Sequence, residues 1–175
     1  MLYLIILTFS RDLCYFSQAK TVILHLESVG ESIHAFLANE IDCSAPLSLY
    51  PSTAARSAWK SFIFRESARR TLLAMFHCIT ICRLHYGSPT GCGHHLMAGN
   101  RITFQRALWE ADSAFDFAMA WNKKNHFLIE ELDFDKFLKN GTASDVDVFG
   151  KMILTGLMGM DELKGWIHTR RILPH

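Results

Sequence analysis

The stretch WKSFIFRESARRTLLAMFH, residues 59–77, decides the fold class, because it has the apolar spacing of a helix but carries charges within its apolar face. At about 100° per residue, Glu66 and Arg70 fall on the same narrow arc as Trp59, Ile63 and Leu73. Glu66 precedes Arg70 by four residues, the favourable order for an ion pair along one helix. A buried charge without a partner costs about 3–5 kcal/mol. We therefore expect partners for these charges.

The same stretch belongs to a long predicted helix that runs from about residue 54 to residue 86. Ser52 or Thr53 is the expected N-cap, since both side chains can accept a hydrogen bond from the first turn. Gly87 and Pro89 follow the helix and are typical of its C-terminal end. We expect Glu66 and the two arginines that follow it to fasten this helix to neighbouring loops.

The N-terminal region is also predicted to be helical. Apolar residues at helical spacing extend from Leu13 to Leu37, and Gly30 could divide this region into two helices. The preceding apolar run, residues 2–9, lacks a basic segment and a cleavage pattern, and it is too short to span a bilayer. Met1 leads directly into apolar sequence without a cap, so we expect the chain to begin inside a domain.

Two further helices are predicted in the C-terminal half. Asp112 or Ser113 opens one of them, and Ser144 or Asp145 is the expected cap of a final helix. Its first turn should hold Asp145 and Asp147, where carboxylates favour the helix dipole. Three glycines within this final helix are expected to permit close packing: Gly150, Gly156 and Gly159. The sequence as a whole predicts one all-α domain, residues 1–175.

Composition restricts the class of partner. The chain has 18 basic and 17 acidic side chains, a net charge of +1, and no long basic block, so direct nucleic-acid binding is disfavoured. Five cysteines scattered along 175 residues indicate reduced thiols rather than a disulfide framework. Half of the chain is hydrophobic, which is typical of a folded protein.

Three motifs occur in an order that resembles a known family. The first is formed by Trp59, Phe62, Ile63, Glu66, Ser67, Arg69, Arg70 and Thr71. It resembles the W-x-x-W-I-x-x-E-S-x-R-R-T signature in the regulatory domain of fungal zinc binuclear cluster transcription factors. Leu108 and Trp109 begin a segment similar to the family's L-W-x-A element, and the segment DVFG, residues 147–150, is similar to a later one.

The chain departs from the family at three points. Phe62 replaces the second tryptophan, Ile102-Thr103 stands where the family has Leu-Pro, and the six-cysteine DNA-binding module is not in this sequence. The resemblance implies a truncated, transcription factor-like regulatory protein in the nucleus or the cytoplasm, without catalytic residues or cofactors. It would act through a protein partner, self-association or a small effector, in a fungal metabolic or secondary-metabolite gene cluster. No membrane association is expected.

Other classes of function stay open. Cys78, Cys82 and His85 share a face of the long helix, and Cys92, His94 and His95 follow, so a small helical metalloprotein or enzyme is one alternative. A shortened, inactive remnant is another. The acidic run at residues 129–137 suggests a solvated helix edge or loop, or a partner-binding segment. The last helix has an adaptable apolar surface: Met152, Leu154, Leu157, Met158, Met160 and Leu163.

Overall fold

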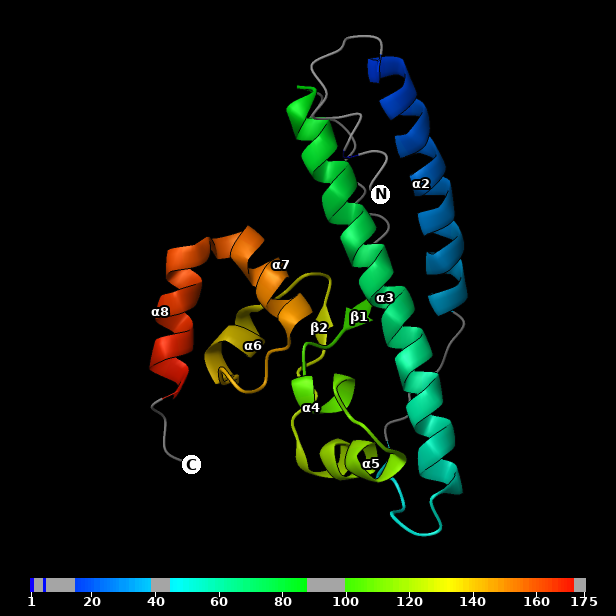
Figure 1. Ribbon diagram of the computed structural model, residues 1–175, viewed down its shortest axis with the longest axis vertical. Helices are drawn as coiled ribbons and strands as arrows, with labels where there is room; N and C mark the ends of the chain where they lie inside the picture. Colours follow the sequence, from blue (N-terminus) through cyan, green and yellow to red (C-terminus); the bar gives the residue numbers. More distant parts are fainter. Residues whose placement is uncertain (2–4, 6–14, 39–44, 88–99, 172–175) are drawn as a thin grey trace. The chain divides into compact units, whose positions relative to one another are not determined.

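A computed structural model describes residues 1, 5, 15–38, 45–87 and 100–171, and within these ranges it is mostly helical (Figure 1). The prediction of an all-α fold is confirmed. The described elements are α2 (Tyr15–Ala38), α3 (Thr53–His85), β1 (Arg101–Ile102), α4 (Arg106–Trp109), α5 (Ala114–Lys123), β2 (Ile129–Glu130), α6 (Asp135–Asn140), α7 (Val148–Met158) and α8 (Met160–Arg171). None of the described helices is long and apolar enough to cross a lipid bilayer.

The chain divides into two compact units. The first unit comprises residues 1–41 and 65–100, and the second comprises residues 42–64 and 101–175. The helix α3 therefore contributes its C-terminal part to the first unit and its N-terminal part to the second. Its observed bounds, Thr53–His85, lie within one residue of those predicted from the capping residues.

The first unit is an antiparallel pair formed by α2 and the C-terminal part of α3 (Figure 1). Its core contains Ala19 and Ile23 from α2 and Ile79 and Cys82 from α3. A salt bridge of 2.6 Å between Arg83 Nη2 and Glu27 Oε1 joins the two helices beside this core. The helix α2 passes through Gly30 without interruption, so the predicted division at this glycine was wrong. Packing against α3 outweighs the low helix propensity of glycine.

The second unit is held by aromatic side chains. Phe62, Leu108 and Phe117 form one buried cluster, in which the rings of Phe62 and Phe117 lie 5.1 Å apart. Phe104 is the centre of another group and is fully buried. Its ring lies about 6 Å from three others, those of Phe134, Phe137 and Phe149.

A two-stranded antiparallel sheet connects distant parts of the second unit. Ile102 of β1 pairs with Ile129 of β2, and Arg101 pairs with Glu130. Both isoleucines are buried, whereas the paired Arg101 and Glu130 side chains are exposed and form an ion pair of 3.0 Å. These strands could not be predicted from the sequence, because two residues are too few to show a strand periodicity.

The caps of the C-terminal helices differ in part from the prediction. Ser113 caps α5 as expected, since its hydroxyl accepts a hydrogen bond from the Asp116 amide. The cap of α7 is Asp147, which accepts from Gly150 N at 2.7 Å, so the assignment of Ser144 or Asp145 was wrong. Asp145 precedes the helix, because its carboxylate is used by the turn at Thr142.

The predicted final helix is two helices, and its glycines serve different purposes. Gly159 has a φ of 86°, a left-handed conformation that ends α7 before α8 begins. Gly150 packs closely, as predicted, because a Cβ atom there would lie 2.6 Å from Phe104 Cγ. Gly156 and Gly159 both have open space around them, so the prediction of close packing was wrong for these two residues.

Candidate functional site

The charged residues of the first motif form a buried cluster on α3. The Glu66 side chain is fully buried, with a relative exposure of 0%. Its Oε1 lies 3.4 Å from Arg70 Nε, and its Oε2 lies 3.8 Å from Arg69 Nη1. Both arginines are themselves buried. The carboxylate is therefore flanked by two guanidinium groups of its own helix, which offsets part of the cost of burying it.

The apolar residues of the same motif belong to the second unit. Trp59, Phe62 and Ile63 pack in the cluster that contains Leu108, so the structure brings the first two family-like motifs together. Trp109 is half-buried on the short helix α4. Ser67 is half-buried and Thr71 is exposed. None of the motif residues lines the cavity of the second unit that is formed around Trp121, His126 and Lys136.

The candidate metal ligands do not form a cluster within the described residues. Cys82 is buried and Cys78 is half-buried, whereas His85 is exposed and packs its ring against Tyr86. The described part of the chain contains no group of three or more His, Cys, Asp or Glu side chains that could hold a metal ion. The other proposed ligands, Cys92, His94 and His95, lie outside the described residues.

The Cys78 thiol is in an environment that disfavours the thiolate. Burial, together with the neighbouring Cys82, raises the pKa of Cys78 from an ordinary value of 9.0 to about 11. The thiolate is the reactive and metal-binding form of cysteine, so a raised pKa suppresses both properties at neutral pH.

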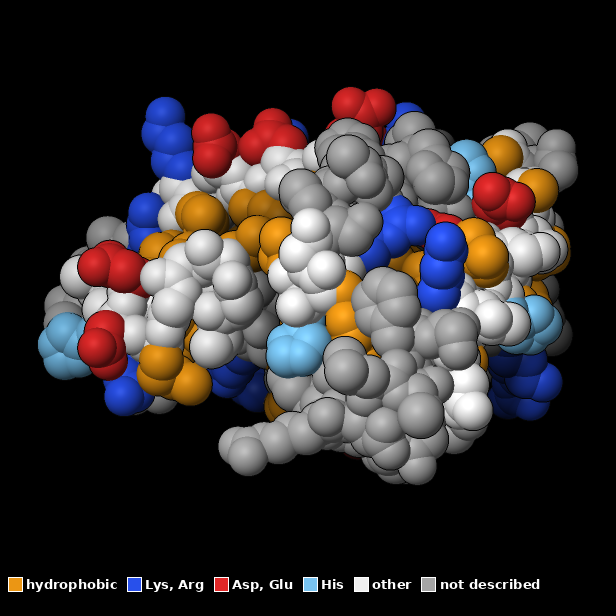
Figure 2. Space-filling view, turned by 90° about the horizontal axis from the view of Figure 1, so that it is seen from above, with side chains coloured by type: hydrophobic (Ala, Val, Ile, Leu, Met, Phe, Trp, Pro, Cys, Tyr) orange, Lys and Arg blue, Asp and Glu red, His pale blue; other side chains and the backbone are white. Residues whose placement is uncertain are grey.

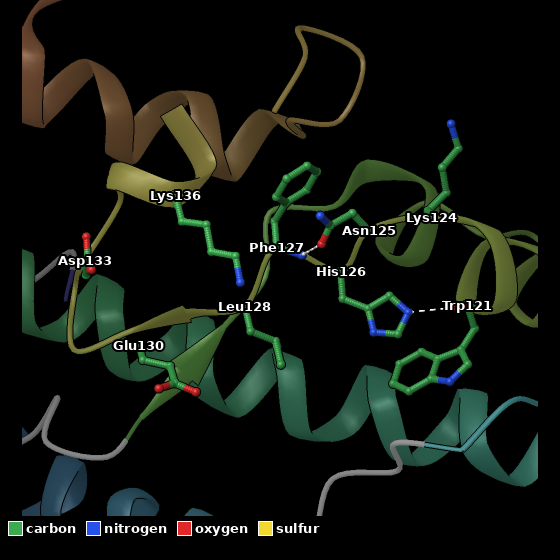
Figure 3. Close-up of a pocket in the computed structure, with 9 residues that line it drawn as sticks. All are labelled: Trp121, Lys124, Asn125, His126, Phe127, Leu128, Glu130, Asp133 and Lys136. Atoms are coloured by element: carbon green, nitrogen blue, oxygen red, sulfur yellow. Dashed lines mark hydrogen bonds between the residues drawn. The ribbon is translucent and has the colours of Figure 1, made fainter. Parts of the chain in front are cut away.

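A cavity in the second unit brings together residues that belong to none of the predicted motifs. It has a volume of about 640 Å³ and lies between the C-terminal end of α5, the loop before β2, and α6 (Figure 3). Nine residues line it: Trp121, Lys124, Asn125, His126, Phe127, Leu128, Glu130, Asp133 and Lys136. The mixture of aromatic and basic residues in WNKKNHF, residues 121–127, is the sequence signal that could have indicated it.

One wall of the cavity is fixed by hydrogen bonds around His126. The imidazole Nε2 lies 2.8 Å from the Trp121 carbonyl oxygen, and the two rings lie 4.1 Å apart. A carbonyl oxygen only accepts, so Nε2 carries the hydrogen and, in the neutral ring, Nδ1 is an acceptor. The His126 carbonyl accepts from Thr103 Oγ1. Gln105 Nε2 donates to the Asn125 carbonyl at 2.9 Å and fixes the adjoining residue.

The backbone around this cavity is unusual. Phe127, Glu131 and Leu132 have φ values of 46°, 51° and 64°, in the left-handed region that residues other than glycine rarely adopt. Each such residue costs about 1–3 kcal/mol unless its surroundings hold it. At Phe127 the amide donates to Asn125 Oδ1 at 3.0 Å, and the ring packs 5.4 Å from that of Phe137. The local fold thus imposes the shape of this wall.

The charged groups at the cavity differ in direction and in pairing. In Figure 3, Lys136 extends from α6 into the space beside Leu128, whereas Lys124 points away from it. Glu130 is paired with Arg101, and Asp133 Oδ1 accepts a hydrogen bond from the Asp135 amide. The acidic run at residues 129–137 therefore forms a strand end, an exposed turn and the start of α6, rather than one continuous helix edge.

Comparison with protein-family models, curated proteins and solved structures gives no match for this chain.

Proposed function

We propose that this chain is an all-α regulatory module of the transcription factor type, and that it acts through a protein partner or a small effector. The observation that carries the proposal is the buried Glu66 carboxylate, which is flanked on its own helix by Arg69 and Arg70. The residues that could suggest catalysis on α3 are thereby engaged in maintaining the helix. In this proposal the charged residues of the first motif stabilise the fold and take no part in a reaction.

Two further observations support the proposal. Leu108, from the second family-like motif, packs against Phe62 of the first, so motifs separated in sequence share one cluster. Acidic and basic side chains are interspersed on the face seen in Figure 2, in agreement with the net charge of +1. Such a distribution is unlike the basic face of a protein that binds DNA directly. Recognition of a promoter would then be the task of a partner.

An exposed apolar surface on α7 is suited to contact with a partner. Val148 and Met152, one helical turn apart, are 73% and 56% exposed. Leu157 of α7 and Met160 of α8 are also more than half exposed, whereas Leu154 is buried. Methionine adapts its shape to different partners, and exposed apolar patches of this kind are typical of protein interaction sites.

A reporter assay tests this function. The full chain is tethered to an unrelated DNA-binding domain, and transcription of a reporter gene is measured. We expect tethering to change reporter transcription, and we expect the double substitution Val148→Glu/Met152→Glu to abolish the change. Lys164→Glu is the matched control, because it alters the net charge by the same amount at an exposed position of α8. An inert tethered chain that folds normally would contradict the proposal.

A further inference from the structure

The cavity in the second unit has the dimensions of a small-molecule site. Ligand pockets in proteins typically enclose about 300–1,000 Å³, and this cavity encloses about 640 Å³. Its walls come from α5, β2 and α6 together with the loop between α5 and β2. The hydrogen bonds from Thr103 and Gln105 to this loop hold the wall in place before any ligand arrives. A preformed wall lowers the entropic cost of binding.

The first requirement on a ligand is a planar ring. Trp121 and His126 present a pair of aromatic rings whose centroids lie 4.1 Å apart and whose orientation is fixed by the hydrogen bond between them. Aromatic side chains favour stacked or edge-to-face contact with another ring. Leu128, at the same cavity, adds an apolar side chain.

The second requirement is a negative charge. Lys136 points into the cavity (Figure 3) and makes no ion pair with a described residue. The two carboxylates at the rim are already engaged, since Glu130 lies 3.0 Å from Arg101 Nε and Asp133 Oδ1 accepts a hydrogen bond from the Asp135 amide. Lys136 is therefore the charged group most available to a ligand, and it suits a carboxylate.

The third requirement is a hydrogen-bond donor. With Nε2 of His126 donating to the Trp121 carbonyl, Nδ1 is left as an acceptor and makes no hydrogen bond to a described residue. A hydroxyl group on the ligand would satisfy it. Such a contact adds specificity, because a ligand without the hydroxyl leaves the Nδ1 acceptor without a hydrogen-bond donor.

From these three requirements we propose that the cavity binds a planar aromatic carboxylate that also carries a phenolic hydroxyl. Lys136 binds the carboxylate, the Trp121–His126 pair contacts the ring, and His126 Nδ1 accepts from the hydroxyl. This assignment names the effector class, and only its link to transcription rests on the proposed function.

Isothermal titration calorimetry of the full chain with para-coumarate tests the site. We expect one molecule bound per chain. Methyl para-coumarate, which lacks the charge, and cinnamate, which lacks the hydroxyl, should each bind more weakly, the ester by about tenfold or more. Tyramine, which carries a cation in place of the carboxylate, should not bind. A preference for tyramine would reverse the charge assignment and overturn the proposal.

Variants then locate the site. Lys136→Gln should weaken para-coumarate by about tenfold or more, the contribution of one charge-assisted contact. Lys139→Gln is the matched control, because Lys139 is an exposed lysine of the same helix α6 that does not line the cavity, and this variant should bind para-coumarate as tightly as the unmodified chain. Melting temperatures of both variants verify folding. Absence of para-coumarate binding, or equal losses in the two variants, would refute the site.

The calorimetric and reporter results separate the two proposals. A chain that binds para-coumarate but leaves the tethered reporter unchanged contradicts the regulatory function and leaves the site standing. A chain that alters the reporter but binds no aromatic carboxylate contradicts the site alone.

Discussion

Two ion pairs of nearly equal geometry lie in different surroundings in the two units. On α3 of the first unit, Arg70 Nε is 3.4 Å from Glu66 Oε1, and on α4 of the second unit Arg106 Nε is 3.3 Å from Glu110 Oε2. Each joins residues four apart. The relative exposures of the acidic side chains are 0% and 49%, and those of the arginines are 6% and 38%.

Because the distances are nearly equal, we expect burial to determine how much each ion pair contributes to the free energy of unfolding. Around Arg106 and Glu110, water stabilises either charge if its partner is removed, so an exposed pair contributes at most about 1 kcal/mol. Around Glu66, water is excluded, and the carboxylate depends on the groups that the fold provides. Residue order adds to the contrast, since the acidic residue precedes the arginine only on α3, the better order for the helix dipole.

The largest effect is expected for Glu66→Gln. Removing the carboxylate nearest to two buried guanidinium groups should lower the free energy of unfolding by about 3–5 kcal/mol. Urea denaturation followed by circular dichroism measures this change. Glu110→Gln, at the exposed pair, should cost less than about 1 kcal/mol. Similar losses in the two variants would show that burial does not separate the pairs.

A second comparison, between two glycines of α7, should give a smaller effect with opposite signs. In Gly150→Ala the new Cβ would lie 2.6 Å from Phe104 Cγ and 2.8 Å from Val146 Cγ2, so we expect a loss of about 1–3 kcal/mol. Gly156→Ala enters open space and should stabilise the helix by about 1 kcal/mol. Thermal melting of both variants measures the difference. A stabilised Gly150→Ala protein would mean that the Phe104 ring moves aside at little cost.

The sequence predicted those features that depend on neighbouring residues along the chain. The ends of α3 follow from Ser52 before it and from Gly87 after it, and the start of α5 follows from Ser113. The buried charges were also visible, because a helix fixes which residues share a face. The strands β1 and β2 were not predicted, because a strand of two residues is too short to show an alternating apolar pattern.

The cavity could not be predicted because it is assembled by contacts between distant residues. His126 is held by Thr103, 23 residues away, and Asn125 by Gln105, 20 residues away. Lys136 approaches the same space from another helix. The division of the last predicted helix at Gly159 was missed for a related reason, because an apolar pattern on both sides of a glycine does not reveal its positive φ.

The smallest expected effect on stability concerns Cys78 on α3, whose thiol can become a charged thiolate at high pH. Burial and Cys82 raise the pKa of Cys78 to about 11, so the folded chain retains the thiol proton at a pH where the unfolded chain, with an ordinary value of 9.0, loses it. Folded protein then binds more protons than unfolded protein, and stability falls as the pH rises between these values. The contribution is fully present below pH 9.0.

The change in unfolding free energy from about pH 8 to about pH 10.5, measured by urea denaturation in the unmodified chain and in Cys78→Ala, isolates this effect. Groups away from Cys78 and its neighbour Cys82 titrate equally in both proteins, so the unmodified chain should lose more stability over the interval than the variant does. Equal losses would contradict the raised pKa of Cys78. A larger loss in the unmodified chain would extend the contrast between the ion pairs to a neutral group. Burial beside a second thiol favours the protonated form of Cys78, and burial of Glu66 makes its carboxylate depend on the neighbouring arginines, so in both cases burial sets the cost of the charge.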